Sequence, residues 1–360
     1  MKNKISINQY SPAIAYGDGI SNSLIFIQSL LIELGFNSKI YIHKKSTNSL
    51  PIKNEFFYIN EYRENPNNFL IYQFSTKDPN HELIMKFKDK KIMLYQNITP
   101  SHFFEGISYK EISNFARKQL SESVNSFIAA ISMSEYSTAE LLKNKYKNVS
   151  IIPLLVDSRK NDNKKINQNL LKKYDDSFNI LFVGRVIQNK CQHNLIDVLY
   201  HLKLNGEKNI KLFIVGRDHY PEYFKFLFEY TKNLGLEKDV IITGPVDDND
   251  LHTYYQISDL YLSLSEHEGF GMPIIEAMNY KIPVLAYDSG AIPSTLGKNG
   301  LLKKKNTSFI SKEILKVKNN TSNRNSLIKK QQIHLKEFNY INVKEKFHNF
   351  LIQVTEDKNA

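Results

Sequence analysis

The sequence of 360 residues contains a single cysteine, Cys191. One thiol excludes an internal disulfide and a zinc site built from several thiolates. No apolar run reaches the roughly 18 to 20 residues needed to span a bilayer, and the polar first residues, MKNKISINQYS, lack the apolar segment of a signal peptide. We therefore expect a cytoplasmic protein.

Apolar and basic residues are plentiful. Hydrophobic residues make up 41% of the chain, which is too much apolar material for a disordered protein. The net charge of +11 is concentrated in residues 301–360, with 13 basic and 5 acidic side chains. This basic block could attract an anionic membrane surface, at about 1 kcal/mol per basic group, or could simply be solvated. Nucleic-acid binding is not indicated, because the aromatic residues lie in apolar runs and not between basic ones.

Short apolar runs alternate with helix-like stretches, which is typical of a parallel sheet covered by helices. The predicted strands span residues 38–42, 69–74, 91–95, 126–133, 149–153, 179–183, 210–215, 240–243, 260–264 and 283–287. The predicted helices span residues 21–34, 191–204, 221–234, 251–258 and 273–279, and the tail from residue 308 is also helical in character.

A polar, charge-rich segment at residues 158–177 interrupts this alternation and is interpreted as a linker. The sequence therefore predicts an α/β protein with two Rossmann-like, doubly wound domains, at residues 1–157 and 178–335. A final helix in residues 336–360 is expected to pack back toward the first domain. Ligands of such sheets bind beyond the carboxyl ends of the strands, so we expect function in the loops there, facing a central cleft.

Arg185 and Lys190 lie in the loop after the strand at 179–183. Arginine binds a diphosphate with two hydrogen bonds and lysine adds a compact charge. The alternative is two solvated residues of a surface loop. Cys191, the next residue, could be a nucleophile or a small packing residue at the start of a helix.

A second loop, with the sequence EGFGMPIIE, runs from Glu268 to Glu276 after the strand at 260–264. Its glycines admit a ligand close to the backbone, and Pro273 suits the start of a helix whose free N–H groups favour an anion. Each carboxylate can accept hydrogen bonds from vicinal hydroxyls, so one could hold a ribose and the other a sugar. Glutamates at this spacing also occur by chance.

Several segments together carry a resemblance to a known family. They are FVGRVIQNK, IVGRD, VIITGPV, DLHTYYQISDLYLSLSEHEGFGMPIIEAM and IPVLAYDSGAIPSTLG, with looser segments YGDGISNSL, YQNITPSHFF and AISMSEYSTAELL in the first half. Through them the chain resembles retaining glycosyltransferases of family 4, which have the GT-B fold. The resemblance implies transfer of a hexose from a UDP-sugar or GDP-mannose to a lipid-linked glycan of the bacterial surface, such as O-antigen, lipopolysaccharide or capsule.

The resemblance also implies roles for individual residues. Arg185, Lys190 and Glu268 would form the catalytic set, and Glu276 would hold the ribose. Other implied donor contacts are Gly17, Gly19, Gly216, Val246, Gly269, Phe270 and Gly271. Two cations and a helix N-terminus can stabilise the charge that develops on the leaving diphosphate, so we expect neither a metal nor a cofactor. The acidic run at 247–250 is explained by N-capping of the next helix more simply than by metal binding.

Departures from the family pattern leave the acceptor side open. Members carry a histidine where this chain has Gln96, and often another at Gln73; glutamine hydrogen-bonds but takes no proton near neutral pH. His102 is a second acceptor-side candidate, or a surface residue, and Ser294 replaces a familiar acidic residue. The alternative function is a degenerate nucleotide-sugar-binding or scaffold protein. In either case the expected partners are a nucleotide sugar, a lipid-linked saccharide and the inner membrane surface, but not nucleic acid.

Overall fold

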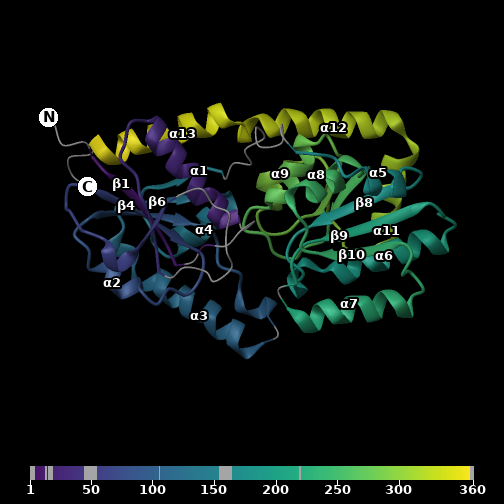
Figure 1. Cartoon of the computed structure of the whole chain (residues 1–360), viewed down its shortest axis with the longest axis horizontal. Coiled ribbons are helices and arrows are strands. Elements are labelled where there is room, and N and C mark those ends of the chain that lie inside the picture. Colours follow the sequence, from purple (N-terminus) through teal and green to yellow (C-terminus); the bar gives the residue numbers. More distant parts are fainter. Residues whose placement is uncertain are drawn as a thin grey trace. The chain divides into compact units, whose positions relative to one another are not determined.

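The computed structural model describes residues 5–12, 14, 19–43, 55–104, 106–153, 164–218 and 220–356. The chain forms two compact units, unit 1 with Met1–Leu155 and Phe338–Ala360 and unit 2 with Val156–Glu337. Each unit has a parallel sheet with helices on both faces (Figure 1). The predicted class of two Rossmann-like α/β domains is therefore confirmed.

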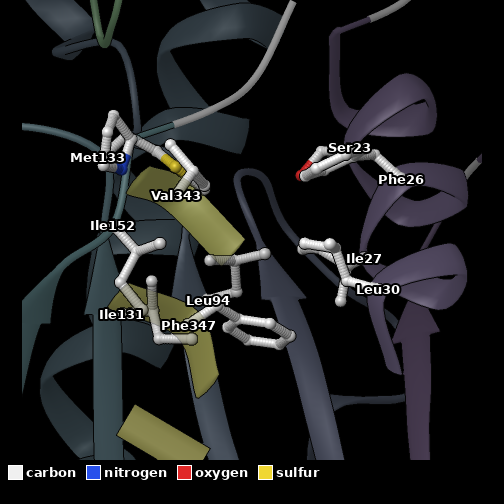
Figure 2. A pocket seen from close by; sticks show the side chains of 11 residues that line it. Ser23, Phe26, Ile27, Leu30, Leu94, Ile131, Met133, Ile152, Val343 and Phe347 are labelled. Carbon is white, nitrogen blue, oxygen red and sulfur yellow. The ribbon is translucent and has the colours of Figure 1, made fainter. Parts of the chain in front are cut away.

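Unit 1 has a seven-stranded sheet in the order β3-β2-β1-β4-β5-β6-β7. Its strands are β1 Ile7–Ser11, β2 Ile40–Ile42, β3 Phe56–Tyr58, β4 Phe69–Phe74, β5 Lys90–Tyr95, β6 Ala129–Ser132 and β7 Val149–Ile151. Its α-helices are α1 Gly19–Glu33, α2 His81–Met85, α3 Ile107–Glu122, α4 Glu135–Lys143 and α13 Tyr340–Glu356. An apolar pocket lies between α1, α13 and the sheet, where Ile27, Leu94 and Phe347 line it (Figure 2).

Unit 2 has a six-stranded sheet in the order β10-β9-β8-β11-β12-β13. Its strands are β8 Phe178–Val183, β9 Ile210–Val215, β10 Val240–Gly244, β11 Leu260–Ser263, β12 Val284–Tyr287 and β13 Leu301–Leu302. Its α-helices are α5 Gln168–Tyr174, α6 Gln192–Leu204, α7 Pro221–Asn233, α8 Asp248–Gln256, α9 Met272–Asn279, α10 Ile292–Leu296, α11 Thr307–Asn319 and α12 Thr321–Leu335. The strand order reverses between β8 and β11, which is where sheets of this kind bind ligands.

The predicted linker is wrong in its second half. Residues 168–174 form α5, which Asn167 caps by accepting hydrogen bonds from the backbone N–H groups of Asn169 and Leu170. Tyr174 is buried, with its ring centre 4.8 Å from that of Phe213. Asn167 also donates from its side chain to Asp250 Oδ1 over 2.8 Å, so a buried tyrosine and a polar cap together hold this short helix on unit 2. The polar composition of the segment gives no sign of this packing.

Two further elements, β1 and α3, were not predicted because they lack the apolar pattern by which the other strands and helices were identified. β1 is buried along its length although it contains Asn8, Gln9 and Ser11. The residues that α3 buries are Ser113, Ala116, Gln119 and Leu120, which are mostly small or polar. Within the described ranges, no helix combines the length and apolar character needed to cross a membrane.

Gln331 of α12 joins this helix to the sheet of unit 2. Its side chain donates to Val284 O (2.8 Å) and Asn299 O (3.0 Å) and accepts from Val284 N (3.0 Å). Because Gln331 is only 1% exposed, the substitution Gln331→Met leaves these backbone groups with neither a side-chain partner nor water to hydrogen-bond. We expect a loss of about 2 kcal/mol in the free energy of unfolding, measured by urea denaturation, whereas the exposed neighbour variant Lys330→Met changes it by less than about 0.5 kcal/mol. Equal stability of the two variants contradicts this role.

Candidate donor-binding site

The strand-order reversal of unit 2 places two loops side by side. The loop between β8 and α6 carries Arg185 and Lys190, and the loop between β11 and α9 carries Glu268. The loops are also joined by their backbones, because Glu266 N donates to Asn189 O over 2.8 Å. The residues expected to form the catalytic set therefore come from the two loops that flank the reversal.

Lys190 and Glu268 form a close ion pair. The Lys190 ammonium lies 2.6 Å from Glu268 Oε1 and donates to His267 O over 3.2 Å. Burial lowers the pKa of Lys190, the Glu268 carboxylate opposes this shift, and the charge of Arg185 adds to it. The Arg185 side chain is exposed and has no hydrogen-bond partner among the described residues. The site thus combines a buried, paired cation with an exposed cation that is available to a ligand.

Glycines allow the strand ends beneath these cations to approach closely. Gly216, after β9, has φ +151°, and a Cβ atom there would lie 1.9 Å from Gly184 O. Gly216 N donates to Gly244 O (3.1 Å), and Val186 N donates to Arg217 O (2.9 Å). Gly216 therefore has a structural role that the family resemblance does not indicate. Val246 is half-buried in the segment between β10 and α8.

The loop from Glu268 to Gly271 is held from the opposite side by α10 and the residues before it. Ala291 N donates to Glu268 O over 2.9 Å, and the Thr295 hydroxyl donates to Phe270 O. Gly290 packs so closely that a Cβ atom would lie 2.6 Å from Glu268 O. Gly271 then caps α9 in a left-handed conformation. This packing fixes the backbone that carries Glu268 and starts the helix that carries Glu276.

Glu276 is held by a tyrosine that the sequence analysis did not single out. The Tyr255 hydroxyl donates to Glu276 Oε2 over 2.6 Å, and its ring stacks on Tyr280 with centroids 4.8 Å apart. The Tyr280 hydroxyl lies 2.6 Å from Nδ1 of His252. Burial raises the pKa of Glu276, and the Tyr255 hydrogen bond opposes that shift. In the sequence, the feature that could have pointed to Tyr255 is the tyrosine pair in DLHTYYQ.

The structure also bears on two open questions, the role of the acidic run at 247–250 and the role of Cys191. The Asp247 carboxylate accepts from Asn249 N (2.9 Å) and Asp250 N (2.8 Å), which confirms the N-cap interpretation. The described residues contain no group of three or more His, Cys, Asp or Glu side chains that could hold a metal ion. Cys191 is buried and burial raises the pKa of its thiol, which favours packing over a nucleophilic role.

The acceptor-side candidates all lie in unit 1. Gln96 follows β5 and donates to Gln73 Oε1 over 2.7 Å. His102 is an exposed residue in a short turn, with its ring centre 4.2 Å from that of Phe103.

Two of the implied donor contacts also belong to the first half of the chain. Gly19 begins α1, while Gly17 lies outside the described residues.

Part of the chain matches a known protein family. Residues 163–334 match the family described as "Glycosyl transferases group 1". The chain carries a glycosyl transferases group 1 domain. This domain contains all of the loop residues described above for unit 2.

Two similar proteins come from bacteria. The amylovoran biosynthesis glycosyltransferase AmsD of Erwinia amylovora is 31% identical over 137 residues, which are 37% of this chain and 37% of that protein. The capsular polysaccharide biosynthesis glycosyltransferase CapH of Staphylococcus aureus is 28% identical over 52% of this chain and 51% of that protein. The chain thus matches about half or less of the length of these relatives.

The fold extends the similarity over the whole chain. The crystal structure of HepE from Anabaena, in complex with UDP and glucose, has a TM-score of 0.75 and 17% identity, covering 97% of this chain and all of that one. At this identity the likeness concerns the fold, which is the GT-B arrangement of two parallel-sheet domains.

Tyr255→Phe removes the hydroxyl that donates to Glu276. With UDP as the probe ligand, we expect binding weaker by roughly 10-fold to 100-fold, as for the loss of one hydrogen bond to a charged group. Because this hydrogen bond opposes the rise of the Glu276 pKa, its loss raises that pKa further. As the pH is lowered, the variant should therefore lose UDP binding at a higher pH than the wild type does. Titration calorimetry across pH measures both effects.

Tyr254→Phe is the matched control. Tyr254 is equally buried and packs its ring on Phe213, but its hydroxyl makes no contact with Glu276. If both variants bind UDP like the wild type, Tyr255 does not support the binding function of Glu276.

Proposed function

We propose that this chain is a glycosyltransferase that moves a hexose from a nucleoside-diphosphate donor to a hydroxyl of a bacterial surface polysaccharide. The observation that carries the proposal is the set of Arg185, Lys190, Glu268 and Glu276 around the strand-order reversal of a group 1 domain. The names of AmsD and CapH place those relatives in the biosynthesis of amylovoran and capsular polysaccharide, which supports this substrate class.

The electrostatics of the site suit a leaving nucleoside diphosphate. Cleavage of the bond to the anomeric carbon places additional negative charge on the phosphate oxygens, and cations placed to meet that charge stabilise it. Arg185 is free to bind these oxygens, and Lys190, which Glu268 holds in place, would add a second positive charge. Glu276, with one carboxylate oxygen bonded to Tyr255, retains the other for a ribose hydroxyl.

The finer features are part of the proposal. UDP-hexoses are the first donors to test, since UDP and glucose are the ligands of the HepE structure, and GDP-mannose is the second. Retention of anomeric configuration and a lipid-linked acceptor follow from the resemblance to family 4. Charge stabilisation by Arg185 and Lys190 makes the reaction independent of a metal ion and of a cofactor.

Nucleotide release from a panel of UDP-, GDP- and dTDP-sugars tests the proposal, with and without a polyprenyl-linked saccharide extract. Wild type should turn over one donor, and Arg185→Gln should reduce the rate about 100-fold. Arg185 is exposed, so this change should leave the fold intact. Lys312→Gln, an exposed change on α11, is the control and should retain the wild-type rate. Nucleotide binding without turnover of any donor would instead establish the degenerate binding protein.

The membrane association is proposed on the basic block of residues 301–360. Part of its charge is neutralised within unit 2, where Lys305 pairs with Glu266, Lys318 with Glu207 and Arg324 with Asp259. Exposed lysines without an acidic partner among the described residues remain, including Lys329 and Lys330 of α12. These lysines would hold a cytoplasmic protein on the anionic inner face of the membrane.

Binding to vesicles of phosphatidylcholine with phosphatidylserine tests this membrane association. Binding should weaken as salt rises from 0.05 to 0.5 M, roughly as expected from screening. Lys329→Glu with Lys330→Glu should reduce it further than Lys172→Glu with Lys238→Glu, which makes the same charge change at exposed positions outside the block. Equal effects of the two double variants, or binding that salt does not weaken, would argue against the block as the contact.

A further inference from the structure

Three glutamines form a row across neighbouring strands of unit 1. Gln9 lies in β1, Gln73 lies in β4, and Gln96 directly follows β5. Gln9 pairs in register with Ile71, and Gln73 with Leu94. Leu94 lines the apolar pocket under α1 and α13 (Figure 2). Residues in parallel register point to the same face of a sheet, and so do residues two positions apart in one strand. Gln9, Gln73 and Gln96 therefore lie on the same face as Leu94, which is the face of the pocket.

The row costs free energy unless its polar groups are paired. Gln9 and Gln73 are fully buried. The adjoining pocket is lined by apolar side chains and by Ser23. An unpaired amide in such surroundings costs roughly 1 to 3 kcal/mol. Apolar residues would pack this face without that cost, so the presence of three linked amides calls for a reason other than packing.

The direction of the hydrogen bonds follows from one backbone carbonyl. Leu24 O can only accept, so Gln9 must direct its Nε2 toward it, over 3.0 Å. Gln9 Oε1 then faces Gln73 and accepts from Gln73 Nε2 over 3.4 Å. Gln73 Oε1 is left to accept from Gln96 Nε2, over 2.7 Å. Each amide thus fixes the orientation of the next.

The last amide of the row has an oxygen without a donor. Gln96 Nε2 also donates to Ser23 Oγ over 3.4 Å, so its nitrogen is committed to the protein. Gln96 Oε1 accepts no hydrogen bond from the described residues. Gln96 is half-buried at the carboxyl end of β5, the edge at which parallel sheets bind their ligands.

We propose that Gln96 presents its carbonyl oxygen as a fixed acceptor for a sugar hydroxyl, and that Gln9 and Gln73 are positioning residues that set its orientation. The inference rests on the proposed glycosyltransferase function. A glutamine in this place accepts at any pH near neutrality, because its amide does not titrate. It selects a ligand that donates a hydrogen bond, such as a sugar hydroxyl, over one that only accepts.

A neutral histidine can do the same work, since it donates from one ring nitrogen and accepts at the other. A protonated histidine has two donors and no acceptor. Gln96→His should therefore keep within about 3-fold of the wild-type kcat/KM at pH 8 and lose activity as the pH falls through about 6.5. The wild type should lack this limb of the pH profile.

The experiment compares kcat/KM for the donor that wild type turns over, from pH 5.5 to 8.5. Gln96→Met, Gln73→Met and Gln9→Met should each reduce kcat/KM about 10-fold, the last two without touching the ligand. Gln28→Met is the control, because Gln28 is a half-buried glutamine of α1 that bonds to Ser38 O outside the row. It should retain the wild-type value.

The outcomes separate the two proposals. An inactive wild type with every donor overturns the proposed function, and the inference with it. An active wild type with Gln9→Met and Gln73→Met variants of lower melting temperature but unchanged kcat/KM overturns the inference alone. The absence of a new acid limb in an otherwise active Gln96→His would also overturn it.

Discussion

The ion pair between Lys190 and Glu268 is the interaction on which the site in unit 2 depends. A buried ammonium is tolerated only beside an opposite charge, and loss of one partner commonly costs about 3 to 5 kcal/mol. The pair joins the loop after β8 to the loop after β11 across the strand-order reversal. Exposed Arg185 is left without a carboxylate among the described residues, so the site keeps one cation for a ligand.

Backbone packing makes this ion pair possible. Gly216 lies against Gly184, and Gly290 lies against Glu268, at distances that no side chain with a Cβ atom permits. The ends of β8 and β9, and the turn before α10, are thereby brought under the two loops. Hydrogen bonds from Glu266 N to Asn189 O and from Ala291 N to Glu268 O then hold the loops in place. The side chains of Lys190 and Glu268 can meet because the backbone that carries them has little freedom.

The two units use different polar chemistry on similar sheets. Unit 2 surrounds its strand-order reversal with ionic groups and with a carboxylate held by a tyrosine, which suits phosphates and a ribose. Unit 1 places neutral amides in a row over a largely apolar face. Neutral acceptors suit sugar hydroxyls, which need orientation but no charge compensation. Charged groups therefore mark the ligand-binding edge of the sheet in unit 2, and neutral amides mark that edge in unit 1.

The sequence by itself determined the fold class, most strands and the position of the loops that form the candidate site. Buried parallel strands read as apolar runs, and β4 and β9 were predicted with their observed bounds. Arg185, Lys190 and Glu268 were singled out because they lie in loops that follow such strands, and Glu276 because it lies in the helix after the second of these loops. Elements that bury small or polar residues, such as β1 and α3, do not show this pattern, and neither does α5, in which Tyr174 is the one buried residue.

Only the tertiary structure decided which side chains meet. The pairing of Lys190 with Glu268 spans 78 positions of the chain, and the contact of Tyr255 with Glu276 depends on how α8 packs beside α9. The direction of the glutamine row depends on a backbone carbonyl in α1. Strand order and hydrogen-bond direction are properties of the folded chain, because local patterns record burial and periodicity but not the partner across the sheet.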